Sequence, residues 1–319
     1  MIRRTVSLLL SGLLSAVAGL SQHSFIVHRT QSFSRDFSGS PIPRFAYGRV
    51  VGYDASRSRY FAFDEKGALL AEGDLSQLGL GRTSINDIAA APDGRLALAT
   101  TIMNSTGLLG NAIVWTTSLG AVIQVVSTTP FGIRRLAFAS DGSLWTAGRA
   151  YTATFQEEPA YDVLRQYDST GKLVRTALSR ATLTRKNNAS VLDCFLATSG
   201  SRVAFISVGS AELIELTSAG EILSRANIPF TQDQIVTGMA MDAAGKVFVS
   251  LQANRKPPSS IPAHSIDLYL VDPTHGALTG ISTNQIRPHG EGVQLMGSDD
   301  SDLVLRLKPP QSLAWIQVD

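Results

Sequence analysis

The chain has 319 residues, of which 44% are hydrophobic and 17% charged, with 27 glycines and a formal net charge of +2. This composition excludes a disordered chain, and its low charge and frequent glycine are typical of a turn-rich all-β protein. Residues 1–20 contain two arginines and no acid, so the remainder balances 26 basic against 26 acidic residues. Without a basic excess, a nucleic-acid partner is not expected.

The first twenty residues have the features of a targeting segment. Arg3 and Arg4 precede an apolar stretch, and Ala16-Val17-Ala18 fits the small-residue pattern of a signal-peptide cleavage site. Ser and Gly interrupt the short stretch, which disfavours a membrane span. We predict a signal peptide at 1–20, a single domain at 21–319 and a secreted or periplasmic protein with no transmembrane segment after cleavage. An uncleaved N-terminal anchor remains the alternative.

A strand–turn–strand motif, called here the first hairpin phrase, occurs four times along the chain. In its clearest copy, over residues 85–99, Pro92-Asp93-Gly94 supplies a tight turn, because Pro fixes φ, Asp bonds nearby backbone and Gly accepts a positive φ. Three further copies centre on turns at Asp141-Gly142, Ser199-Gly200 and Ala244-Gly245. Strict alternation within these copies, as in residues 246–250, favours strands, and no helix longer than a turn or two is expected.

A second hairpin phrase alternates with the first and ends its turn in glycine. The glycines are Gly67, Gly120, Gly171, Gly220 and Gly276, so the period is about fifty residues, as in repeat folds built from four-stranded units. Two hairpins make one antiparallel unit, and the chain contains six, counting partial ones at 45–74 and 293–318. We expect a strand at 24–28, followed by a loop at 31–43, to complete the last unit beside 313–318.

The phrases at 90–99, 136–145 and 239–249 resemble the blade repeats of six-bladed β-propellers, of the NHL and gluconolactonase-like (senescence marker protein) type. The resemblance implies an all-β, six-bladed β-propeller with four-stranded antiparallel blades, its ring closed by the N-terminal strand. The motifs are degenerate, so they are specific for architecture and not for an activity.

Alternating strand direction places the short turns on one face and the long loops, at 101–111, 149–162 and 252–265, on the other. Long loops on a rigid scaffold usually carry binding. These long loops lie at the same edge as the starts of the innermost strands. In the first unit, the innermost strand is expected to start near residues 45–47. The candidate ligand-binding residues at this channel mouth are Asn86, Asp87, Arg134, Arg135, Asp193, Thr237, His289 and Glu291. The pattern does not decide which residue of each adjacent pair faces the channel, and the polar groups could simply pair with one another and with water.

The resemblance to lactonases implies a divalent metal such as Ca²⁺ held by Glu, Asn and Asp ligands. Asn86-Asp87 resembles the Asn-Asp phrase of that family. At the position of the family's metal-binding Asn, however, this chain has Arg134-Arg135, and at the position of the family's Asp it has Thr237-Gly238. No Glu stands at 45–48, so no metal or other cofactor is expected. A different metal site, formed by Asp193, His289 and Glu291, remains an alternative.

Other catalytic motifs are also missing, since the sequence has no Gly-x-Ser-x-Gly, phosphate loop or His-Glu-x-x-His. Cys194, the only cysteine, lies in an apolar run and is expected to be a buried structural thiol. The prediction is a monomeric, non-catalytic binding or interaction protein, whose partner is a small anion attracted by Arg134 and Arg135 or another protein. The alternative is a divergent lactonase-like or other propeller hydrolase with a rearranged, metal-binding channel site.

Overall fold

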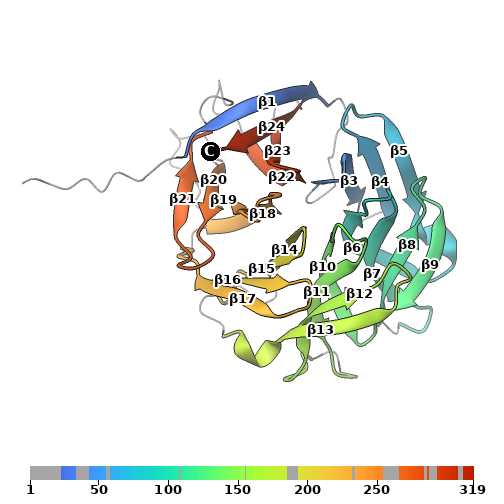
Figure 1. Ribbon diagram of the computed structural model, residues 1–319. Coiled ribbons are helices and arrows are strands. Elements are labelled where there is room, and N and C mark those ends of the chain that lie inside the picture. The colour runs from blue at the N-terminus through green and yellow to red at the C-terminus, as the bar shows by residue number, and fades with distance from the viewer. Residues whose placement is uncertain are drawn as a thin grey trace, which may run out of the picture.

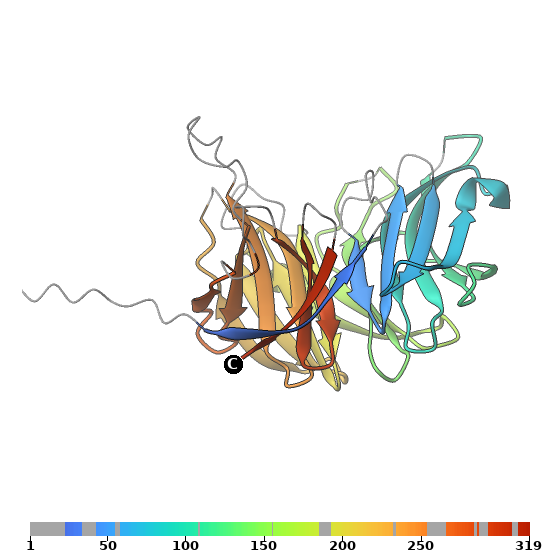
Figure 2. The same cartoon turned by 90° about the horizontal axis from the view of Figure 1, so that it is seen from above.

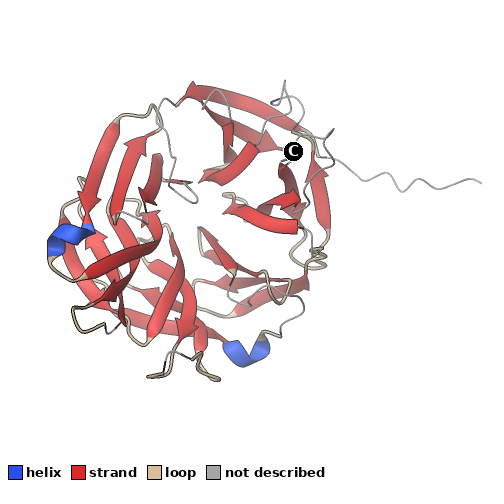
Figure 3. Cartoon of the chain, turned by 180° about the vertical axis from the view of Figure 1, so that it is seen from behind, coloured by secondary structure: helices blue, strands red, loops and turns tan. Residues whose placement is uncertain are grey.

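The computed structural model describes residues 23–33, 43–54, 58–107, 109–154, 156–184, 193–231, 234–253, 266–283, 286, 293–307 and 312–319. The predicted signal peptide at 1–20 lies outside these residues. In the described part the chain consists of strands, with short 3-10 turns at η1 (Leu75–Leu78) and η2 (Arg180–Thr182) (Figure 3). No helix in this part is long and apolar enough to cross a bilayer.

Four sheets each contain four antiparallel strands that follow one another in chain order. The first is β6 (Arg82–Ala90), β7 (Leu96–Met103), β8 (Leu109–Thr116) and β9 (Val122–Ser127). The second is β10 (Phe131–Phe138), β11 (Leu144–Ala150), β12 (Asp162–Tyr167) and β13 (Leu173–Ser179). The third is β14 (Cys194–Ser199), β15 (Arg202–Ser207), β16 (Glu212–Thr217) and β17 (Ile222–Asn227). The fourth is β18 (Gln234–Met241), β19 (Val247–Ala253), β20 (Ile266–Val271) and β21 (Leu278–Ile281).

The fifth sheet has eight strands and joins the two ends of the chain. Its order is β1-β24-β23-β22-β2-β3-β4-β5, and the two halves meet at a parallel pair, Phe45 opposite Gly297. One half is β2 (Arg44–Ala46), β3 (Arg49–Asp54), β4 (Arg59–Asp64) and β5 (Leu69–Asp74). The other is β22 (Val293–Asp299), β23 (Asp302–Leu307), β24 (Ser312–Val318) and β1 (Phe25–Ser32).

The sheets are arranged around a common centre, with β6, β10, β14, β18 and β22 innermost (Figure 1). The apolar core lies between neighbouring sheets. One cluster joins Trp145 and Val163 of the second sheet to Phe205 and Ile214 of the third, and all four side chains are fully buried. Because each sheet buries both faces against its neighbours, the middle strands are apolar on both sides.

The N-terminal strand pairs with β24 as predicted, from Phe25 opposite Val318 to Ser32 opposite Ser312. It runs along the outside of the chain's C-terminal strands (Figure 2). It is longer than the expected 24–28 and includes the first two residues of the expected loop at 31–43. The expected loop at 101–111 is also largely strand, since β7 continues to Met103 and β8 begins at Leu109. The β-branched residues at 100–102 favour that extension.

The glycines of the second hairpin phrase all have positive φ, from +72° to +92°. At Gly120 the turn also touches the neighbouring sheet, because a Cβ there would lie 2.7 Å from the carbonyl oxygen of Glu72 in β5. Both the left-handed backbone and the close approach require glycine at this position. The repeat therefore fixes contacts between sheets as well as turns within them.

Gly120→Ala is expected to lower the free energy of unfolding by about 2–4 kcal/mol, the combined cost of a strained φ and an overpacked contact. Gly142→Ala is the matched control, because Gly142 has φ +79° and a Cβ at that position would have no neighbouring atom within 4 Å. The control should cost only about 1–2 kcal/mol. Urea denaturation of both variants measures the difference, and equal losses would contradict the inter-sheet contact.

Candidate functional site

Irregular pairing marks the innermost strands near the predicted channel residues. The register shifts between Ile85 and Asp87 in β6, and corresponding shifts occur in β10, β18 and β22. The residues that these shifts skip are Asn86, Arg134, Thr237 and Met296. A β-bulge of this kind bends the strand and re-aims the side chains beside it. The bulges therefore decide which member of each adjacent pair points inward, a choice that simple alternation could not make.

Asp87 is the most buried of the candidates that the structure describes, with 4% of its surface exposed. Its Oδ2 lies 3.0 Å from Nη2 of Arg44 and accepts a 2.7 Å hydrogen bond from the backbone N–H of Leu136 in the next sheet. Arg44 also donates through Nη1 to the carbonyl of Leu136, at 2.7 Å. Arg44 and Asp87 thus connect β2, β6 and β10 at the centre of the molecule.

Burial raises the pKa of Asp87, and the guanidinium groups of Arg44 and Arg135 oppose that rise. Burial likewise lowers the pKa of Arg44, with Asp87 acting against the change. Arginine stays protonated in proteins. Two cations therefore act on one carboxyl group. The cluster of Arg44, Arg135 and Asp87 carries a net positive charge whether Asp87 is protonated or ionised.

Arg135 is the second cation of this cluster, and among the described residues no ion pair holds it. Its Nη1 donates to the carbonyl of Arg134 at 2.9 Å, and its guanidinium carbon lies 5.0 Å from the ring centre of Phe195. Its Nε is buried without a hydrogen-bond partner in the described structure. The adjacent Arg134 is exposed. Of the predicted arginine pair, Arg135 is therefore the inward member.

The remaining candidates have structural or peripheral positions. The amide nitrogen of Asn86 donates to Thr101 Oγ1 at 3.0 Å and to the Ile133 carbonyl at 3.3 Å. Thr237 hydrogen-bonds Ser250 within its own sheet, at 2.9 Å between hydroxyl oxygens. Asp193 is exposed at the start of β14. His289 and Glu291 lie outside the described residues, so their predicted roles stay predictions.

Cys194 lies beside the same cluster and is 1% exposed. Burial raises the pKa of its thiol to about 11, although Arg135 acts in the opposite direction. A thiol held protonated at neutral pH is a poor nucleophile. The prediction of a buried structural cysteine is confirmed.

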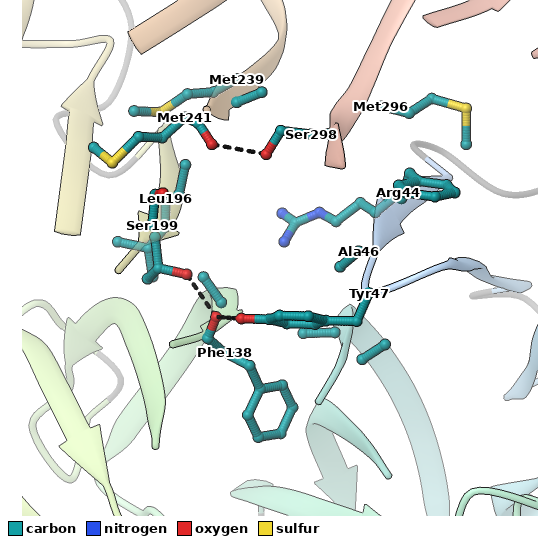
Figure 4. Close-up of a pocket in the computed structure, with 18 of the residues that line it drawn as sticks. Arg44, Ala46, Tyr47, Phe138, Leu196, Ser199, Met239, Met241, Met296 and Ser298 are labelled. Carbon is teal, nitrogen blue, oxygen red and sulfur yellow. Dashed lines mark hydrogen bonds between the residues drawn. The ribbon is translucent and has the colours of Figure 1, made fainter. Parts of the chain in front are cut away.

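A cavity of about 350 Å³ occupies the centre next to Arg44. Arg44 points into it, and Met239, Met241, Met296 and Leu196 surround it (Figure 4). The lining comes from the second halves of the innermost strands and the turns after them. The cavity therefore lies toward the short-turn face, whereas the sequence placed the ligand at the long-loop face. Turn length indicates where chain is abundant, but the packing of side chains decides where space remains.

The sequence patterns missed Arg44, since it precedes the segment aligned with the other strand starts. A usable signal existed, because Arg44 directly follows Pro43 and a Ser- and Gly-rich segment and so begins the first strand of that unit. The methionines were also missed. Their sequence positions are typical of ordinary core residues, and only the arrangement of the innermost strands around a common centre brings them to one cavity.

The implied lactonase metal does not fit these residues. In the described ranges no three His, Cys, Asp or Glu side chains are grouped so that they could hold a metal ion. Asp87, the matching carboxylate, already faces the Arg44 guanidinium at 3.0 Å, and Arg135 adds a second positive charge. A divalent cation there would be repelled by both arginines.

The repeated four-stranded antiparallel sheets around a common centre define a β-propeller-type fold, as the sequence resemblance implied. No protein-family model and no curated protein matches the sequence.

Solved structures are nevertheless similar over nearly the whole chain. A DUF4221-family protein from Bacteroides vulgatus is 9% identical, with a TM-score of 0.58 over 94% of this chain and 99% of that one. An exported protein from Bacteroides fragilis is 11% identical, with a TM-score of 0.55 over 92% and 95%. A gluconolactonase from Xanthomonas campestris is 13% identical, with a TM-score of 0.45 over 92% and 99%. At these identities the likeness is one of fold.

Proposed function

We propose that the chain is an exported six-bladed β-propeller that binds a small anion in its central channel without catalysing a reaction. Counting each half of the eight-stranded sheet as one blade gives the six. The N-terminal signal at 1–20, a single domain at 21–319 and a monomeric state belong to this proposal. The exported relative from Bacteroides fragilis supports the location.

The observation that carries the binding proposal is the excess of cations at the centre. Arg44 and Arg135 face the single carboxyl group of Asp87, and Arg135 Nε has no partner among the described residues. A partly buried guanidinium with free donor capacity is suited to a carboxylate or a similar anion, because charge-assisted hydrogen bonds offset the loss of solvation. Catalysis is not part of the proposal. In the described residues no three His, Cys, Asp or Glu side chains are grouped as metal ligands, and burial keeps the Cys194 thiol protonated.

A thermal-shift titration with acetate, benzoate, octanoate, sulfate and phosphate at low ionic strength tests this function. At least one anion is expected to raise the melting temperature, because a ligand that binds the folded state stabilises it. Arg135→Gln should weaken that binding measurably, because it removes one of the two positive charges that act on the centre. Arg134→Gln is the matched control, since the neighbouring side chain is exposed, and should leave binding nearly unchanged.

Stabilisation by none of these anions would contradict the proposal, as would equal effects of the two arginine variants. Clear stabilisation by Ca²⁺ or Zn²⁺, lost on adding a chelator, would instead favour the metal-dependent hydrolase alternative.

A further inference from the structure

The central cavity has a sharply divided lining. Its walls are apolar, with Met239, Met241, Met296 and Leu196 each at most 9% exposed as residues. Arg44 is the only cationic residue among those that line it in the described chain. Figure 4 shows the guanidinium reaching into this space, whereas the side chains of Met241 and Met296 point away from it. A pocket with apolar walls and few polar groups is the usual form of a small-molecule site.

Among the described lining residues, three of the five hydroxyl side chains already donate hydrogen bonds to backbone carbonyls. Tyr47 and Thr198 both donate to the carbonyl oxygen of Phe138, at 3.0 and 2.6 Å. Ser298 donates to the carbonyl of Met241 at 2.7 Å. A ligand rich in hydroxyl groups would therefore find few free partners along these walls. Directional recognition is left to Arg44, whose two contacts, with Asp87 and Leu136, leave further N–H donors available.

Acidic side chains also line the cavity. Asp299 and Asp300 lie at the turn after β22, and both line the space. Asp299 accepts a 3.0 Å hydrogen bond from Trp315 Nε1, and Asp300 is exposed. A second negative charge on a ligand would lie near these carboxyl groups and be repelled. The cavity consequently favours one anionic group placed beside Arg44.

From this arrangement we infer that the ligand is a monocarboxylate with a flexible apolar chain, its carboxylate beside Arg44 and its chain against the apolar part of the lining. The inference rests on the anion binding proposed above and names its ligand class. The volume of about 350 Å³ lies within the range of ligand pockets.

Calorimetric titration of the unaltered protein with straight-chain carboxylates from acetate to dodecanoate tests the inference. Each added methylene is expected to tighten binding about fourfold until the cavity is full, after which affinity levels off. Octanol, which has the chain without the charge, should bind at least about tenfold more weakly than octanoate.

A blocking variant provides the second arm. Ala46 lines the cavity beside Arg44, so Ala46→Phe should abolish octanoate binding by filling the space. Ala121→Phe is the matched control, because that alanine is exposed in a turn, and should bind octanoate normally. If Ala46→Phe does not fold, the chain-length series on the unaltered protein still decides the question.

The failures are distinguishable. Anions that bind with no dependence on chain length, or octanoate that binds Ala46→Phe normally, would overturn the ligand class and leave anion binding intact. Binding of no anion at all would overturn both proposals. If octanol binds as tightly as octanoate, the cavity recognises the apolar chain and not the carboxylate, and the inference of a carboxylate ligand is overturned.

Discussion

A chain that begins at residue 34 is expected to be insoluble or unfolded, whereas a chain that begins at residue 21 should fold normally. The shorter chain lacks β1, so β24 stays paired with β23 on one side but loses its antiparallel partner on the other. The unpaired edge would expose backbone donors and acceptors that readily pair with other chains. Circular dichroism and size-exclusion chromatography of the two chains check this expectation.

Side chains of the N-terminal segment make the loss larger than one edge strand. Phe33 is 1% exposed and packs edge-on against Phe63, with ring centres 5.9 Å apart. Arg29 lies 3.7 Å above the Trp315 ring and bonds Glu65 at 2.8 Å. The segment therefore connects the last sheet half to the first. A melting temperature of the 34–319 chain equal to that of the 21–319 chain would refute the proposed closure.

Phe33→Ala gives a point test of the same connection. Removing a buried phenylalanine commonly costs about 3–5 kcal/mol of stability. If the segment closes the ring, this variant should still fold but unfold at clearly lower urea concentration.

Asp87→Ala is expected to lower the free energy of unfolding by about 3–5 kcal/mol, because it leaves the buried Arg44 without its counterion. It also removes the acceptor for the Leu136 N–H, which lies in the neighbouring sheet. Both losses occur at the centre, where Asp87 is 4% exposed. Urea denaturation followed by tryptophan fluorescence measures the change.

Glu65→Ala is the control for this second prediction. Glu65 also pairs with an arginine, Arg29, through two 2.8 Å contacts, but both side chains are partly exposed. An exposed pair contributes about 1 kcal/mol or less. Equal losses in the two variants would show that the Arg44–Asp87 pair is not buried as described.

The repeat was predictable because turn chemistry is local. The positive φ at Gly120 and Gly276 follows from the short hairpins that their positions in the sequence define. The pairing of the N-terminal strand with 313–318 was also predictable, since incomplete units at the two chain ends leave edges that can satisfy each other.

The site was only partly predictable. The sequence predicted that Asp87 and Arg135 lie near the centre, because equivalent positions in repeated units meet there, and their role in binding stays a prediction. Arg44 and the methionines were not found, and the cavity lies toward the other face. Bulges explain part of this, since one inserted residue reverses which side chain points inward.

Local sequence patterns were enough to predict the all-β class, the order of the hairpins and the residues in their turns, because these depend on neighbours a few positions apart. Tertiary structure decided that Arg44 faces Asp87, that Arg135 has no counterion among the described residues, and that Met241 and Met296 share one cavity. Those relations join segments that lie far apart in the chain. They depend on how the side chains of successive sheets pack around a centre, and no local pattern encodes that packing.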